Sequence, residues 1–214
     1  MIIQLRLTSI LIERSINIMT KTKIKDTRRQ QLIQASLESI AELGLQNTTI
    51  LTISRRAGLS SGIISHYFGG KQGLIEAALR YLMAQLGQDL RQRLQQGEVS
   101  PEQRLNAIIE ANFTDFQRSD LATRTWLSFW ARSMHEPGLQ RLQQINNARL
   151  YSNIRYAFAL KLNAEAATDA ARQLAAMIDG FWLRSALSLD PQEGFSAGER
   201  LCKQFALTAL AEGT

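Results

Sequence analysis

The sequence predicts an all-α fold of about nine helices, arranged as a small three-helix domain followed by a larger helical domain. Its 214 residues include only three prolines and 13 glycines, so helix breakers are few. Apolar residues recur at spacings of three and four, which place them on one face of a helix, whereas strand-like alternation is weak. We expect a disordered extension over 1–24, the small domain over 25–71 and the larger domain over 72–214.

The first 24 residues lack a pattern that predicts a packed element. Met1 to Ile18 mixes apolar and polar positions, without the continuous apolar core and small-residue cleavage site of a secretory signal. Met19 precedes the basic stretch Thr20 to Arg29 and would make a reasonable start for a cytosolic protein. No apolar run approaches the roughly 20 residues that span a bilayer, so we expect a cytoplasmic protein that does not enter a membrane.

The small domain begins with a helix whose apolar face holds Ile33, Leu37 and Ile40. Gly44 is placed to end this helix, because glycine readily adopts the left-handed conformation of a C-terminal cap. The first helix should therefore stop before the pair of shorter helices that follows.

Those two shorter helices are predicted over 50–57 and 61–67. Thr49 can cap the first and Ser60 the second, while Gly58 supplies the positive φ that a tight turn between them requires. Two helices joined in this way form a helix-turn-helix, whose second helix enters the major groove of DNA. Short helices around a glycine are also common in proteins that do not bind DNA, so geometry alone leaves both interpretations open.

The larger domain is divided into helices by recognisable start and stop signals. Gly97 ends a long helix, and Ser100 to Gln103 combine a serine cap, a proline at the first position and a glutamine three residues after the cap. Pro137-Gly138 and Asp190-Pro191 mark further breaks. The expected helices cover about 72–96, 100–116, 120–135, 139–162, 164–189 and 195–212.

Charge is distributed unevenly along the chain. Residues 1–96 carry 13 Lys and Arg against six Asp and Glu, whereas residues 97–214 carry 12 against 13, so the N-terminal part holds the whole net charge of +6. A basic segment joined to a near-neutral one is typical of a polyanion-binding module attached to another domain. This favours double-stranded DNA as a partner, although many solvated surfaces are mildly basic.

Small and polar residues near the start of the second short helix can reach base edges, and nearby cations can contact phosphates. Lys71 begins the next helix, where a cation opposes the helix dipole and makes more sense as a phosphate contact. The expected DNA-binding residues are Arg28, Thr49, Ser60, Ser61, Gly62, Ile63, Ser65, His66, Tyr67 and Lys71.

The larger domain contains all three tryptophans and a carboxylate near one of them. Aromatic faces with a nearby anion can hold a quaternary ammonium ion through cation–π attraction. The expected ligand-binding residues are Phe113, Trp126, Trp130, Asp179 and Trp182. Aromatics at helical spacing are more often part of a core, and that alternative stays open.

The residue types and motifs of this chain do not favour an enzyme. The only histidines are His66 and His135, the single cysteine is Cys202, and neither a glycine-rich phosphate loop nor metal-ligand spacing is present. We therefore expect no catalytic residues, no metal and no cofactor.

The stretch from Thr48 to Ser60, followed by Gly62, His66-Tyr67-Phe68 and Lys71, resembles the DNA-binding domain of TetR-type repressors. Ser54 departs from the alanine usual in that family. The resemblance covers about 25–75 and implies that Tyr67 and Lys71 clamp phosphates, and that a homodimer binds one palindromic operator.

Within that family, four segments are similar to the choline-responsive repressors of glycine betaine synthesis. This similarity implies repression of genes for choline uptake and oxidation, relieved by choline. It also implies that the last two helices form the dimer interface, so Trp182 could instead pack against the partner subunit. A repressor of a multidrug efflux pump that senses bulky cations is the alternative, and a helical scaffold that does not bind DNA is a third class. The four segments are 61–68, 126–130, 133–137 and 178–184.

Overall fold

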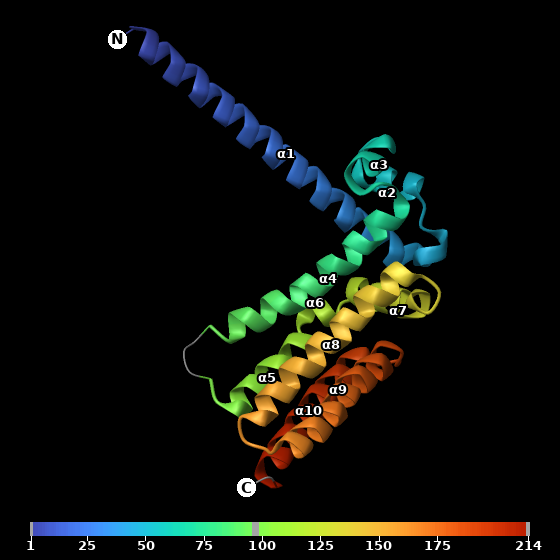
Figure 1. The fold of residues 1–214 in the computed structure, drawn as a ribbon. Coiled ribbons are helices and arrows are strands. Elements are labelled where there is room, and N and C mark those ends of the chain that lie inside the picture. Colours follow the sequence, from blue (N-terminus) through green and yellow to red (C-terminus); the bar gives the residue numbers. More distant parts are fainter. Residues whose placement is uncertain (1, 96–98, 213–214) are drawn as a thin grey trace.

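The computed structural model describes residues 2–95 and 99–212, with side chains from Lys23 onward, and this part of the chain contains ten helices and no strand (Figure 1). The all-α prediction is confirmed, and the tenth helix is the single turn α6. Within the described ranges, no helix combines the length and apolar character needed to cross a membrane. The helices are α1 (Ile2–Asn47), α2 (Ile50–Ala57), α3 (Gly62–Phe68), α4 (Lys71–Arg93), α5 (Pro101–Asn112), α6 (Asp115–Arg118), α7 (Asp120–Ser133), α8 (Pro137–Ala159), α9 (Ala164–Ala186) and α10 (Pro191–Glu212).

The backbone of α1 is helical from Ile2, which differs from the disordered extension expected over 1–24. Helical hydrogen bonds join residues four apart and need no partner from elsewhere in the fold. No glycine or proline interrupts the chain between Ile2 and Gly44, so these bonds can continue along it. Gly44 itself has φ 74° and ψ 158°, which places a kink where a helix end was expected. Figure 1 shows α1 (blue) projecting from the remaining helices.

The second half of α1 packs with α2 and α3 into the small domain. Leu37, Ile53 and Ile64, one from each helix, are fully buried members of one hydrophobic core. The predicted pair of short helices is thus present, with α2 packed against α1 and α3 packed against the start of the helix that follows, α4.

Helix α4 leads from this small domain into a bundle formed by α5 to α10 (Figure 1). α9 and α10 pack along each other at the far side of the bundle. The two domains also touch directly, because α1 packs against α7. The buried hydroxyl of Thr125 on α7 lies 3.4 Å from the carbonyl oxygen of Leu37 on α1.

The observed helix starts agree with the capping residues predicted from the sequence, except in two respects. The capping box at Ser100 is confirmed. Pro137 and Pro191 stand at the first positions of α8 and α10, so these helices begin earlier than expected, because the fixed φ of proline suits a first turn. Ser60 does not cap α3: the residue before that helix is Ser61, which makes no side-chain capping bond.

Candidate DNA-binding surface and effector cavity

The turn between α2 and α3 is held by local bonds. The side chains of Thr49 and Thr52 form a reciprocal capping box at the start of α2, with N–O distances of 3.1 and 2.8 Å. Gly58 ends α2 with φ 65°, and its N–H donates to the carbonyl oxygen of Arg55 at 3.2 Å. The positive φ at Gly58 is the conformation the sequence predicted, and it directs the chain into α3.

One side of α3 is exposed and carries the residues expected to meet DNA. Ser61, Gly62, Ser65 and His66 are exposed, and Ile64 on the opposite side is fully buried. Tyr67 is half-buried, with its ring centroid 5.0 Å from that of His66. The surface therefore presents short polar groups flanked by an aromatic hydroxyl.

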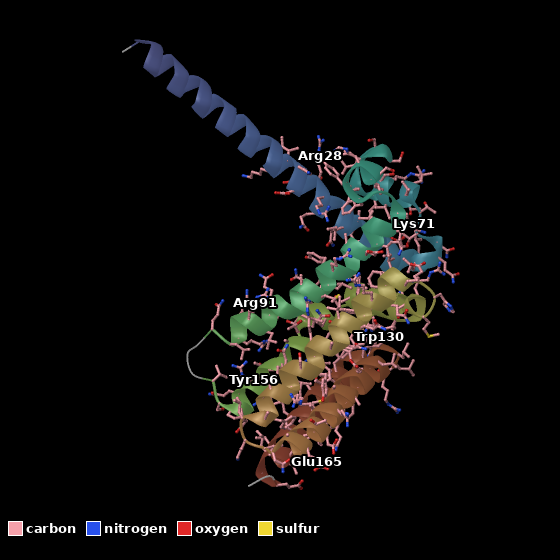
Figure 2. The ribbon with its side chains drawn as sticks, in the orientation of Figure 1. Arg28, Lys71, Arg91, Trp130, Tyr156 and Glu165 are labelled. Carbon is pink, nitrogen blue, oxygen red and sulfur yellow. The ribbon has the colours of Figure 1, made fainter. Side chains whose placement is uncertain are left out.

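Basic residues border this surface in two different roles. Arg29 ties α1 to α3, because its Nη1 donates to the carbonyl oxygen of Tyr67 at 3.2 Å and its guanidinium lies 4.6 Å from the centroid of the Phe68 ring. Arg28 and Lys71 have no carboxylate partner among the side chains that the structure describes. Both are therefore available to phosphates, and Figure 2 shows them near α3.

The serine in place of the family's alanine is accommodated within the small domain. Ser54 is buried, and its hydroxyl donates to the carbonyl oxygen of Leu51 at 3.2 Å. The extra polar atom is thus satisfied within α2, and the packing of the domain is retained.

In the bundle, a small cavity joins four of the five predicted ligand-binding residues. Trp126 and Trp130 on α7 and Asp179 and Trp182 on α9 all line it, and its volume is about 30 Å³. We call it the indole cavity. Phe113 does not line it: this residue is 2% exposed and packs edge-on against Phe195, at a centroid distance of 6.4 Å. The remaining lining residues are Leu86, Asn112, Gln117, Asn146, Leu150 and Ile178.

The indole rings are closed against one another. The ring centroids of Trp130 and Trp182 are 5.3 Å apart with the planes inclined at 61°, an edge-to-face contact. A volume of about 30 Å³ suits one or two water molecules rather than an organic cation. An organic cation can therefore enter only if lining side chains such as these rings move apart.

Trp182 belongs to the interior of a single subunit. It is 6% exposed and lines the indole cavity, so its ring is not a surface group awaiting a partner chain. The alternative in which Trp182 packs against the other subunit does not agree with this placement.

Asp179 gives the cavity a negative group. The residue lines the cavity and is partly exposed to solvent, yet burial of its carboxyl group raises its pKa to about 6 through loss of hydration. No described Lys, Arg or His pairs with it. A cation in the cavity would supply the missing partner.

Sequence reasoning missed Gln117, a lining residue on the single turn α6. Its side chain is 1% exposed, and its Oε1 accepts a hydrogen bond from Trp126 Nε1 at 2.9 Å. One turn of helix has no periodic pattern, so nothing in the sequence distinguishes this glutamine from a solvated one.

A second cavity adjoins the first. It has a volume of about 510 Å³, lies between α4, α5 and α8, and shares Leu86, Asn112, Asn146 and Leu150 with the indole cavity. These four residues form a wall common to both cavities.

Family models match both parts of the chain. The model of bacterial regulatory proteins of the tetR family covers residues 32–78, and that of the BetI-type transcriptional repressor C-terminal domain covers 101–211. The chain belongs to the TetR family. It is 51% identical over 174 residues to the HTH-type transcriptional regulator BetI of Proteus mirabilis, which spans 81% of this chain and 87% of the relative. The corresponding regulator of Yersinia pestis strain Pestoides F is 51% identical over 193 residues, with 90% and 93% covered.

Solved structures share the TetR fold at lower identity. A TetR transcription regulator from Haloarcula marismortui superposes with a TM-score of 0.75 at 18% identity, over 86% of this chain and 98% of that one. A putative transcriptional regulator from Saccharomonospora viridis, solved in complex with choline, gives a TM-score of 0.70 at 20% identity, over 82% and 95%. These likenesses confirm the fold.

The TetR assignment establishes a DNA-binding transcriptional repressor with a BetI-type C-terminal domain. TetR-family regulators bind operator DNA as dimers and are not enzymes, which agrees with the absence of a recognisable catalytic pattern in the sequence.

Proposed function

We propose that this repressor controls genes for choline uptake and oxidation to glycine betaine, and that choline bound in the indole cavity relieves repression. The observation that carries the proposal is the convergence of three tryptophans and an unpaired carboxylate on one small cavity. Indole faces and a carboxylate are the groups that hold a quaternary ammonium ion. The BetI names of the relatives and the choline complex of a structural neighbour support the same ligand.

The size of the cavity favours a small cation over a bulky one. Choline requires a smaller enlargement of the cavity between Trp130 and Trp182 than a polycyclic drug cation does, because it is the smaller molecule. This supports choline over the alternative of an efflux-pump repressor.

Movement at the rings has a short path to the DNA-binding domain. α7 carries Trp126 and Trp130 and also packs on α1 beside Thr125. α4 provides a second link, because it begins at Lys71 and contributes Leu86 to the cavity wall. Separating the rings shifts α7 or α9, and a shift of α7 changes the position of α1 and with it the direction in which α3 faces.

The repressor acts as a homodimer in this proposal, with two α3 helices about 34 Å apart on a palindromic operator in the cytoplasm. Apolar side chains exposed at the end of α9 and on α10 support a dimer contact there, since their burial against a second copy would remove them from water. These side chains are Leu183, Leu187, Leu189 and Leu207.

The test measures operator binding with and without candidate effectors. Fluorescence anisotropy with DNA from upstream of the choline uptake and oxidation genes should give a dissociation constant that rises at least about ten-fold in millimolar choline. Bulky cationic dyes should have little effect. Trp130→Ala should bind the same DNA without ligand and lose the response to choline. Release by dyes with no response to millimolar choline would overturn the proposal.

A further inference from the structure

The indole cavity has a second chemical feature besides its aromatic faces and carboxylate. Gln117 Nε2 and Trp130 Nε1 are both buried from solvent, and neither has a hydrogen-bond partner among the described atoms. Both side chains line the cavity. Buried hydrogen-bond donors are nearly always paired. Two unpaired donors on one cavity therefore indicate that a hydrogen-bond acceptor binds in it.

The orientation of the Gln117 amide is fixed by chemistry. An indole N–H only donates, so the oxygen of the amide must face Trp126, which it contacts at 2.9 Å. The NH2 group is thereby directed to the other side of the amide and retains its donors. Trp130 Nε1 likewise can only donate.

We propose that Gln117 and Trp130 form a hydrogen-bond-donating end of the indole cavity, which selects cations carrying a neutral oxygen acceptor over cations without one. The inference rests on the proposed binding of a small quaternary ammonium ion in this cavity. The hydroxyl of choline accepts from these donors while the ammonium group lies among the rings near Asp179. A carboxylate in place of the hydroxyl would bring a second negative charge into the cavity that Asp179 lines, so a cationic alcohol fits better than a zwitterion.

The test compares two ligands of equal charge and nearly equal shape. In trimethyl(propyl)ammonium a methyl group replaces the hydroxyl of choline, so the ratio of their dissociation constants reports recognition of the oxygen alone. Calorimetric titration of the full-length protein should show choline binding about ten-fold or more tightly than the propyl compound, because the analogue leaves both donors unpaired.

Two independent variants locate the effect. Gln117→Met retains length without a donor, and Trp130→Phe retains an aromatic ring without the indole N–H. Each should reduce the choline preference toward one, whereas Gln88→Met, an exposed position on α4, should leave it unchanged. Trp130→Phe is the cleaner of the two, because no described hydrogen bond uses the Trp130 indole N–H, whereas Gln117→Met also frees the N–H of Trp126, a donor that lines the same cavity.

Three outcomes overturn the inference. Equal dissociation constants for the two ligands with the unsubstituted protein would show that the cavity binds cations without recognising the oxygen. A preference retained in both variants would place the recognition elsewhere. If neither ligand binds, the proposed effector site itself is wrong and this inference fails with it. The first result needs no substituted protein, so the inference can be tested even if a variant does not fold.

Discussion

Asp179 lines the indole cavity, where lost hydration raises the pKa of its carboxyl group to about 6. In the unfolded chain the same group titrates at about pH 4. Between these values the folded protein holds a proton that the unfolded chain has released, so this group makes stability fall as the pH rises from about 4 to about 6. Above pH 6 the carboxylate is ionised and lacks a cation partner.

Choline binding should therefore depend on pH although the charge of choline does not titrate. Affinity is expected to rise from pH 5 to pH 7, with a midpoint near pH 6, and to level off above it, as calorimetry at each pH can show. Asp179→Asn should remove this dependence and weaken binding at pH 7.5 about ten-fold. Affinity that is constant from pH 5 to pH 8 would exclude Asp179 as the anion.

A substitution at Gly62, on the exposed side of α3, allows contact with DNA to be tested separately from the stability of the fold. A Cβ built at this position meets nothing within 4 Å, so Gly62→Ala should leave thermal unfolding of the free protein unchanged or slightly raise the midpoint. If the α3 backbone approaches the DNA closely, the added methyl group should lower operator affinity about ten-fold in an anisotropy titration. Unchanged operator affinity would mean that this end of α3 stays away from the bases.

Among the helices, the sequence predicted those features that depend only on residues close together in the chain. Thr49 and Gly58 act within α2 and its turn, so their roles could be read from residue type alone. The extent of α1 and the single turn α6 could not, because the first lacks an amphipathic pattern and the second is too short to show one. Residue chemistry selected Trp126, Trp130, Trp182 and Asp179, which do line one cavity, and their binding of a ligand stays a prediction. It also selected Phe113, which lies outside that cavity, because aromatic character does not reveal which side of a helix faces a cavity.

The contact between α7 and α1 leads to a prediction about how choline binding in the bundle affects operator binding by the small domain. Thr125→Val preserves the shape of the buried side chain and removes a hydroxyl that lies 2.6 Å from the carbonyl oxygen of Leu121 within α7 and 3.4 Å from that of Leu37 on α1. Choline affinity should persist, while the change in operator affinity caused by choline should shrink several-fold. Ser128→Ala is the control, because that hydroxyl donates only within α7, to the carbonyl oxygen of Arg124. Equal coupling in the two variants would show that the Thr125 hydroxyl does not contribute to communication between the two domains.

For the whole molecule, the charge asymmetry and the fold agree. The basic N-terminal part contains the helix-turn-helix, and the near-neutral part forms most of the bundle (Figure 1). Attraction to DNA is thereby confined to one end, while the other end remains free of strong nonspecific contact with polyanions.

Operator affinity should fall steeply with salt, and Lys71 should account for a defined part of the slope. Lys71→Ala is expected to reduce the slope of log affinity against log salt by about one per subunit, since each phosphate contact releases about 0.9 counterion. Lys161→Ala, an exposed lysine after α8, should leave the slope unchanged. An unchanged slope in Lys71→Ala would remove this residue from the phosphate contacts.

The closed packing of Trp130 on Trp182 also affects how quickly a ligand binds in the indole cavity. If the rings must part before a solute enters, the observed association rate reaches a plateau at high solute concentration, at the rate of ring opening. The apparent dissociation constant is then the intrinsic one divided by the open fraction. The concentration at which this sensor switches is thus adjustable through the packing of two indoles, without any change in the groups that touch the ligand.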